Sequence, residues 1–273
     1  MFRDPSTPAL EPAVRDFYRD AMQQLNDSGI EFLVGGAYAL AQYTGVERHT
    51  RDFDIFVRRD DCQRALDVLE KAGYRTELTF PHWLGKAYHC GNYIDLIFSS
   101  GNAICDVDDE WFNNATAGNV LDMPAKLVPP EEMIWPKAYI MERERFDGAD
   151  IVHLIHACAK QLDWDRLMQR MGTAWRVLLT HLILFGFIYP GERSLIPERV
   201  MKELLDRLQN ELTVDETPNH CCQGTLLSRA QYLVDVECLG YSDARVKPVG
   251  KMSKEEISIW TAPIRESAGK ESL

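Results

Sequence analysis

The chain has 273 residues, of which 45% are hydrophobic and 26% are charged, and this composition predicts a folded globular protein with a sizeable core. The net charge is −12, and nearly all of it lies in residues 1–150. This acidic half argues against a protein that wraps a long nucleic acid, whereas it leaves open the binding of one RNA end and suits a site for divalent cations.

The sequence also argues against export and membrane insertion. The N-terminal segment is charged and Pro-rich without an apolar core, which is unlike a signal peptide, and the longest apolar run, 177–189, is too short to span a bilayer. Seven cysteines without a Cys-x-x-Cys pair favour neither a disulfide framework nor a structural zinc site. We therefore expect a cytoplasmic protein without membrane contact, whose oligomeric state the sequence leaves open.

The N-terminal part predicts helices and strands in alternation. Apolar spacing and turn residues predict helices at 14–26, 37–43 and 60–71, and strands at 30–34, 53–57, 74–80, 86–90 and 93–98. The pair Gly91-Asn92 predicts a hairpin between the last two strands.

The C-terminal part predicts helices only. They are expected at 131–146, 150–162, 164–171, 175–187 and 198–212. Pro124 and Pro129-Pro130 indicate a linker between the two parts. We therefore expect an α/β domain at 1–128, a helical domain at 129–240 and a flexible tail at 241–273.

Two acids open the predicted strand at 53–57. Asp52 and Asp54 are two residues apart, so their side chains share one face of a strand and repel each other unless a cation lies between them. A divalent cation removes that repulsion. Taken alone, the pair favours the simpler interpretation of two solvated acids at the start of a strand.

A third acid makes a metal site more specific. Asp95 lies within Tyr93–Ile97, and a carboxylate among apolar strand residues is costly unless it is paired or binds a metal. If its strand lies beside the first, three carboxylates meet, and such a set can hold two Mg²⁺ ions for phosphoryl transfer. The alternative is an acid on an edge strand that faces water.

Gly35-Gly36 ends a predicted strand just before a predicted helix. Such a turn exposes backbone N–H groups at a helix N-terminus, where a phosphate can bind, and glycine allows its close approach. By itself the pair also fits an ordinary tight turn.

The order of these features resembles a known family. The run FLVGGAYALAQYTGVERHTRDFDIFV at 32–57, with Asp95 downstream, is similar to the nucleotidyltransferase superfamily typified by DNA polymerase β, and most similar to small bacterial nucleotidyltransferases of the abortive-infection toxin type. The resemblance implies an α+β fold, in which a mixed sheet flanked by helices is followed by a C-terminal helical region. The gap between Gly36 and Asp52 is somewhat longer than in the most compact members.

The resemblance also implies roles for individual residues. Gly35 and Gly36 would hold the β- and γ-phosphates of an NTP, and Asp52, Asp54 and Asp95 would bind two Mg²⁺ ions, with Mn²⁺ as an alternative. Asp95 would also be the candidate general base. Thr50 and Arg51 would contact the triphosphate or the acceptor, and Arg48 would be structural.

A second segment, WPKAYIMERERFDGADIVHLI at 135–155, is also similar to the toxin-type branch. It would supply Lys137 as a cation for the triphosphate, with Arg145, Asp147 and Asp150 in supporting roles, although Phe146 separates two residues that the family joins. The alternating charges at 142–145 equally favour a solvated face with ion pairs.

The implied reaction moves an NMP group from an NTP to an acceptor hydroxyl on a small molecule, a tRNA or a protein, and releases pyrophosphate. Four alternatives remain open: a metal-dependent glycosyltransferase that uses Asp-x-Asp, an Asp-x-Asp phosphatase, a nucleotide-binding or partner-binding module without catalysis, and a toxin that modifies tRNA or protein. A phosphatase would place its acids at the end of an apolar strand, whereas Asp52 and Asp54 open theirs.

Overall fold

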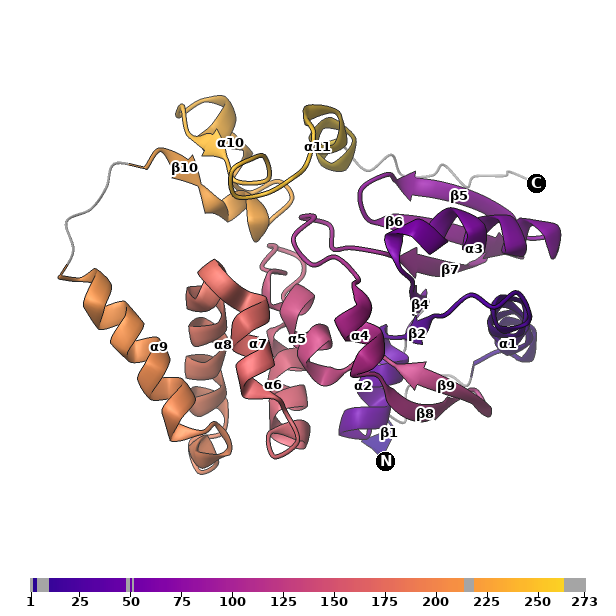
Figure 1. Ribbon diagram of the computed structural model, residues 1–273, viewed down its shortest axis with the longest axis horizontal. Coiled ribbons are helices and arrows are strands. Elements are labelled where there is room, and N and C mark those ends of the chain that lie inside the picture. Colours follow the sequence, from indigo (N-terminus) through magenta and orange to yellow (C-terminus); the bar gives the residue numbers. More distant parts are fainter. Residues whose placement is uncertain (1, 4–9, 48–49, 51, 214–218, 263–273) are drawn as a thin grey trace.

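The protein is described here from a computed structural model that covers residues 2–3, 10–47, 50, 52–213 and 219–262. The fold is α+β, as predicted: a mixed seven-stranded sheet carries helices on its faces, and a helical region follows it (Figure 1).

The sheet has the strand order β5-β6-β7-β4-β2-β9-β8. Neighbours run antiparallel except at two places, where β4 lies parallel to β7 and β2 lies parallel to β9. In that spatial order its strands are β5 (Arg75–Phe80), β6 (Leu84–His89), β7 (Asn92–Ile97), β4 (Asp52–Phe56), β2 (Leu33–Val34), β9 (Met123–Leu127) and β8 (Thr116–Val120).

Burial on β4 alternates and so sets the two faces of the sheet. Phe53 and Ile55 are fully buried, and the Phe53 ring stacks on Tyr18 at 4.7 Å between centroids. Asp52 and Asp54 lie on the other face, because successive side chains of a strand point to opposite sides. The helices that belong to the sheet are α1 (Pro12–Asp27), α2 (Gly36–Thr44), α3 (Arg59–Lys71) and α4 (Asp109–Asn113).

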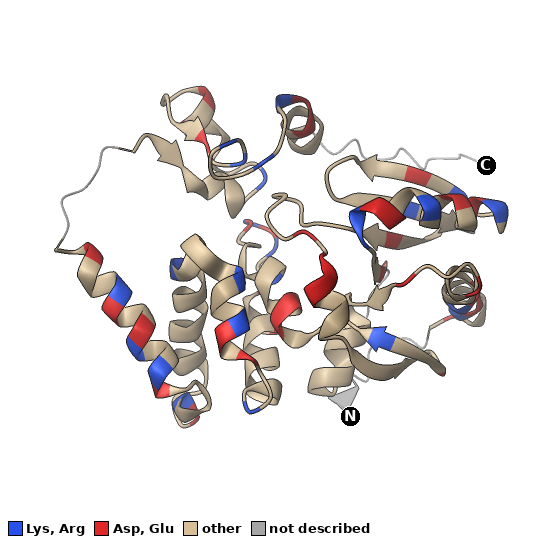
Figure 2. Cartoon of the chain, in the orientation of Figure 1, with Lys and Arg blue, Asp and Glu red and all other residues tan. Residues whose placement is uncertain are grey.

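The helical region lies beside the sheet as neighbouring rods (Figure 1). Its helices are α5 (Pro130–Ala138), α6 (Gly148–Cys158), α7 (Trp164–Met171), α8 (Trp175–Ile188) and α9 (Glu198–Glu211). Lysine, arginine and acidic residues alternate along α9, whereas α8 beside it carries one charged residue, Arg176 (Figure 2). The two helices differ in charge because α8 packs against α6, α7 and α9 and is therefore more buried than α9.

The apolar run at 177–189 belongs to a longer segment that is only partly buried: 39% of its most apolar stretch lies inside the protein. Residues 164–188 are long and apolar enough to cross a membrane by length and composition alone. Gly172, at φ +49°, separates α7 from α8, and Leu178, Leu182 and Phe185 are buried in the core. The segment is therefore two helices, each with a face in the core.

Short elements complete the chain. They are the strands β1 (Phe2–Arg3), β3 (Val46–Glu47), β10 (Cys221–Cys222) and β11 (Ser242–Asp243), the 3₁₀ helices η1 (Gly172–Ala174), η2 (Arg193–Leu195) and η3 (Gln223–Leu226), and the helices α10 (Leu233–Glu237) and α11 (Lys254–Thr261). Within the predicted tail, Trp260 of α11 packs edge-on against Phe80 and Trp83. Residues 263–273 of that tail lie outside the described residues, and the predicted domain boundaries stay predictions.

One predicted helix is wrong in its second half. The helix expected at 131–146 ends at Ala138, and the chain then folds back so that Met141 pairs with Phe146. Glu142 accepts hydrogen bonds from the Ser228 hydroxyl and the Arg229 N–H, which explains how this irregular segment is held.

Candidate functional site

The register of two parallel strands places the predicted acids together. Asp54 on β4 is directly opposite Asp95 on β7, and Asp52 is directly opposite Tyr93. Paired residues of neighbouring strands point to the same face, and Asp52 shares that face with Asp54. The sheet therefore brings all three predicted acids to one face.

Asp95 occupies an interior strand. Its strand β7 lies between β6 and β4, and the residue is 9% exposed. The alternative of an edge-strand acid facing water is therefore wrong. The prediction that the acids open their strand is confirmed, although β4 begins at Asp52, one residue before the predicted start.

Two of the three carboxylates have partners inside the protein. The Tyr93 hydroxyl donates to Asp52 Oδ1 at 2.5 Å, and the Lys86 ammonium donates to Asp95 Oδ1 at 2.5 Å. No hydrogen bond from a side chain of the described residues reaches Asp54. Asp54 is thus the acid whose charge is least compensated by its neighbours.

The pKa values follow this arrangement. Burial, followed by the negative charges of Asp95 and Asp52, raises the pKa of Asp54 to about 7. The positive charges of Lys137 and Arg145 act on this carboxyl in the opposite direction. Burial also raises the pKa of Asp95, and the Lys86 ammonium offsets part of that effect.

The diglycine turn packs directly against the acids. The Gly35 N–H donates to the Asp54 carbonyl oxygen at 3.0 Å, and Gly36 opens α2 with φ +54°. A Cβ atom on Gly36 would lie 1.7 Å from Asp54 Oδ2, and one on Gly35 would lie 2.3 Å from the Phe56 ring. Only glycine fits at these positions, so the N-terminus of α2 reaches the carboxylate.

The second predicted segment forms a compact ion cluster. The Lys137 ammonium on α5 donates to Asp147 at 3.0 Å and to Asp150 at 2.7 Å, and Arg145 binds Asp147 through two nitrogens at 2.9 and 3.0 Å. The side chains of Lys137, Asp147 and Asp150 are 13%, 9% and 3% exposed. The interpretation as a solvated face is wrong for these three residues, whereas Arg145 is exposed.

Burial disfavours the charge of Asp147, but Arg145 and Lys137 hold the pKa of this carboxyl below its usual range. Asp147 therefore remains ionised at neutral pH, and the positive charge of Arg145 is close enough to act on Asp54.

The remaining predicted residues precede β4. The Thr50 hydroxyl exchanges hydrogen bonds with the backbone of Asp52, both at 3.2 Å, and so fixes the entry to the strand. Arg51 and Arg48 lie outside the described residues.

The donor set fits a divalent cation in chemistry. Carboxylate oxygens are the ligands that Mg²⁺ and Mn²⁺ take. Burial, and then repulsion from Asp95 and Asp52, raises the pKa of Asp54, and a bound cation would relieve that repulsion. Among the described residues, no group of three or more His, Cys, Asp or Glu side chains is arranged so that it could hold a metal ion as it stands. Asp52 and Asp95 are instead held by Tyr93 and Lys86.

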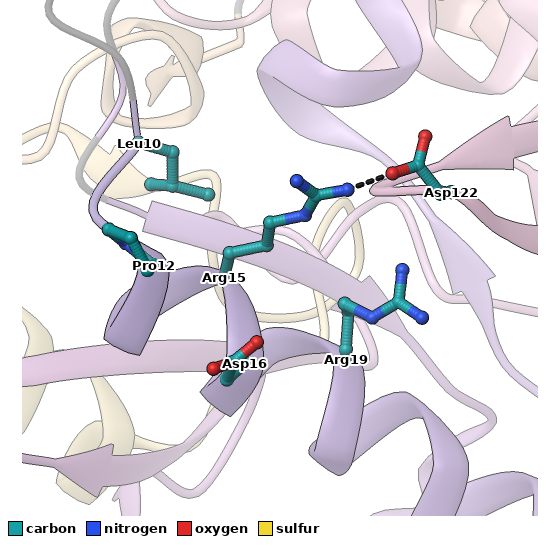
Figure 3. A pocket seen from close by; sticks show the side chains of 6 residues that line it. All are labelled: Leu10, Pro12, Arg15, Asp16, Arg19 and Asp122. Carbon is teal, nitrogen blue, oxygen red and sulfur yellow. Dashed lines mark hydrogen bonds and ion pairs between the residues drawn. The ribbon is translucent and has the colours of Figure 1, made fainter.

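A surface hollow of about 540 Å³ lies elsewhere. It is bounded by α1 and the β8–β9 turn, where Arg15 is paired with Asp122 (Figure 3). None of the three acids, the two glycines or Lys137 lines it. The hollow is therefore separate from the residues that carry the predicted chemistry.

Lys86 and Tyr93 were not singled out as functional from the sequence. The predicted hairpin is confirmed, but its turn is Cys90-Gly91 and not Gly91-Asn92, and this shift sets the register in which Lys86 is opposite Asp95. The turn as predicted would have placed Tyr88 there. The hairpin alone says nothing about the Tyr93 contact, which depends on the long-range pairing of β7 with β4.

Several solved structures are similar to this chain. The solution structure of the antibiotic-resistance factor ANT(2'')-Ia has 14% sequence identity and a TM-score of 0.44, and the match covers 65% of this chain and 99% of that one. The lincosamide antibiotic adenylyltransferase LnuA with bound lincomycin has 18% sequence identity and a TM-score of 0.38, and the match covers 52% of this chain and 94% of that one. An antigenic nucleotidyltransferase-like protein from Paracoccidioides brasiliensis has 15% sequence identity and a TM-score of 0.37, and the match covers 62% of this chain and 91% of that one.

At these values the structural similarities support no conclusion about substrates. No curated protein matches the chain in sequence. A family model does: residues 17–184, more than half of the chain, match the uncharacterised nucleotidyltransferases. That matched range includes the diglycine turn, the three acids and Lys137, and the protein belongs to this family of uncharacterised nucleotidyltransferases.

Proposed function

We propose that the protein transfers a nucleoside monophosphate from an NTP to an acceptor hydroxyl and releases pyrophosphate. The observation that carries the proposal is the register of β4 and β7, which sets Asp54 opposite Asp95 while Gly36 packs against Asp54. The turn proposed to hold the triphosphate and the three acids are thereby contiguous, which supports a site for transfer of a phosphoryl group.

In this proposal the three acids hold the divalent ions, two Mg²⁺ or alternatively Mn²⁺. Bound there, the ions would neutralise the triphosphate and make the acceptor oxygen more nucleophilic. Asp95 is the candidate to accept the proton of the acceptor hydroxyl, because burial raises its pKa above that of an ordinary carboxyl.

The diglycine turn and the ion cluster are proposed to hold the NTP. The first N–H groups of a helix lack acceptors within the helix, so α2 offers donors to phosphate oxygens beside Asp54. Lys137 and the exposed Arg145 supply positive charge near the same carboxyl. Thr50 and Arg51 are proposed to contact the triphosphate or the acceptor from the entry to β4.

The acceptor is proposed to be a hydroxyl on a small molecule, a tRNA or a protein. Membership of the abortive-infection toxin type stays a prediction, and so does a cytoplasmic location, which the seven free cysteines support.

The decisive experiment identifies what acquires label. The purified protein is incubated with Mg²⁺, a cell extract and each of the four NTPs labelled at the α-phosphate. We expect label on an extract component, with pyrophosphate released. Asp54→Asn should reduce this transfer by at least about 100-fold while the fold survives. Asp206→Asn, an exposed acid on α9, is the matched control and should leave transfer unchanged.

The same design separates the alternatives. Transfer from labelled nucleotide sugars, with none from NTPs, would identify a glycosyltransferase. Calorimetric binding of Mg-ATP without any labelled product would identify a binding module. Wild-type turnover in Asp54→Asn would reject the assignment of the acids.

A further inference from the structure

Lys86 forms a buried ion pair with the third acid. Its ammonium lies 2.5 Å from Asp95 Oδ1, and the two side chains are 17% and 13% exposed. The pair is fixed by the backbone, because Lys86 and Asp95 are directly opposite each other in the antiparallel pairing of β6 with β7. The contact is therefore part of the sheet rather than a chance surface approach.

The Lys86 ammonium makes a second favourable contact from the same position. It lies 4.0 Å from the centroid of the Tyr93 ring, a cation–π contact, and the hydroxyl of the same ring binds Asp52. One cationic side chain thus lies within reach of an aromatic face while it is bound to Asp95.

A resident ammonium and a divalent cation compete for the same oxygens. An ammonium neutralises the charge of Asp95 and engages its Oδ1 atom, which a metal ion would also need. A metal ion at Asp95 requires the carboxylate to leave Lys86 or to share its oxygens with it.

We propose that Lys86 is a positioning residue that binds Asp95 where a metal ion would bind in the nucleotide-free protein, and that it releases Asp95 and keeps its contact with the Tyr93 ring when metal and NTP bind. The inference rests on the proposed function, since it presumes that the three acids bind metal. Its consequence is that Lys86 keeps metal affinity low until a nucleotide brings its own phosphate oxygens as ligands. No covalent step is involved.

The test measures Mn²⁺ affinity without nucleotide, by electron paramagnetic resonance of the free ion. Lys86→Gln keeps a hydrogen-bond donor and removes the charge, and we expect it to bind Mn²⁺ about tenfold more tightly than the wild type. Lys86→Arg keeps the charge and should resemble the wild type. Lys126→Gln, an exposed lysine on the opposite half of the sheet, is the matched control and should also resemble it. Equal or weaker Mn²⁺ binding by Lys86→Gln would overturn the proposal.

A second measurement uses the folded wild type, in case Lys86→Gln is unstable. Protein with ¹⁵N-labelled lysine side chains is observed by NMR, and the Lys86 Nζ signal is assigned from its loss in Lys86→Arg. We expect this signal to shift or vanish when Mg²⁺ and a non-hydrolysable NTP analogue are added together. A signal that persists unchanged at saturation would show that Lys86 does not release Asp95.

These results separate this inference from the proposed function. If label transfer occurs and the wild type binds Mn²⁺ with an NTP, but Lys86→Gln is no tighter without it, only the role of Lys86 fails. If neither protein binds Mn²⁺ with or without an NTP, the metal site and the role of Lys86 fail together.

Discussion

Gly36 lies so close to the Asp54 carboxylate that no side chain, not even the methyl group of alanine, fits at position 36. We predict that Gly36→Ala destabilises the protein by more than 1 kcal/mol, because the added Cβ would lie 1.7 Å from Asp54 Oδ2 and because φ is +54°. Binding of Mg-ATP, measured by calorimetry, should be lost.

Gly73→Ala is the matched control for that variant. Gly73 also has a positive φ, +95°, but a Cβ there meets nothing within 4 Å. This variant should show only the cost of the backbone conformation, about 1 kcal/mol, and should bind Mg-ATP normally. Equal ATP affinity in the two variants would contradict the role of the diglycine turn.

The raised pKa of Asp54 predicts an unusual pH dependence. The unfolded chain releases this proton near pH 4, whereas the folded, metal-free protein retains it to about pH 7. The contribution of Asp54 to the free energy of unfolding therefore falls as the pH rises through this interval. In EDTA, Asp54→Asn should gain thermal stability relative to the wild type between about pH 5 and about pH 8.

Added Mg²⁺ should raise the melting temperature of the wild type more at the higher pH, because the metal competes with the proton. Asp206→Asn should follow the wild type at every pH. A melting temperature of Asp54→Asn that falls relative to the wild type as the pH rises would contradict the assigned direction.

At the scale of elements, the first turn of α5 is fixed by buried ion pairs to α7. The Arg166 guanidinium binds Glu131 at 2.6 Å and lies 3.3 Å from Glu132, and these carboxylates are 3% and 0% exposed. We predict that Arg166→Ala costs roughly 3 kcal/mol in urea unfolding, because it leaves the buried Glu131 carboxylate without its cationic partner, whereas Glu132 keeps Arg170.

Lys202→Ala tests whether burial is the reason for the large cost of Arg166→Ala. Lys202 pairs with Asp206 on the exposed side of α9, at 70% and 53% exposure. Its loss should change the free energy of unfolding by no more than about 0.5 kcal/mol. A similar cost for both variants would mean that burial does not distinguish the two pairs.

The elements with strong periodicity were predicted well and the weak ones were not. The predicted bounds of α7 agree with the structure, and the strand with the acids differs by one residue. Strands β8 and β9 were missed, because β8 contains Gly118 and β9 contains Pro124, and their burial is slight. The helix predicted through 146 ended early because tertiary contacts of Glu142 outweigh local charge pattern.

At the scale of the whole molecule, the C-terminal segment is attached to the far edge of the sheet. The Trp260 ring packs on Phe80 and leaves no room for a Cβ on Gly101, whose nearest ring atom would be 2.7 Å away. Arg229 places its guanidinium 4.5 Å from the same ring and donates to the Ala262 carbonyl. The segment after β11 thus has specific contacts with the sheet.

We predict that Trp260→Ala costs roughly 2 kcal/mol in urea unfolding, less than a fully buried tryptophan, and speeds proteolysis within 241–262. Ile259→Ala, at a residue that is 45% exposed, is the matched control and should cost no more than about 0.5 kcal/mol. Equal stability and equal proteolysis of the two variants would support the flexible tail that the sequence predicts.

The candidate site was predictable in its residues but not in its electrostatics. The three acids and the diglycine turn follow from order along the chain, and the structure brings them together. The site also depends on two hydrogen bonds, from Tyr93 to Asp52 and from Lys86 to Asp95. These form only when the right strands become neighbours, and sequence periodicity does not encode which strands pair.

The parallel pairing of β4 with β7 has a consequence for variation of the protein. The separation between Asp54 and Asp95 is maintained by interstrand hydrogen bonds and not by the length of the crossover through α3, β5 and β6. Insertions at the turn between α3 and β5 would therefore leave the acids in place. This crossover is the natural position for grafting new recognition loops onto an unchanged reaction centre.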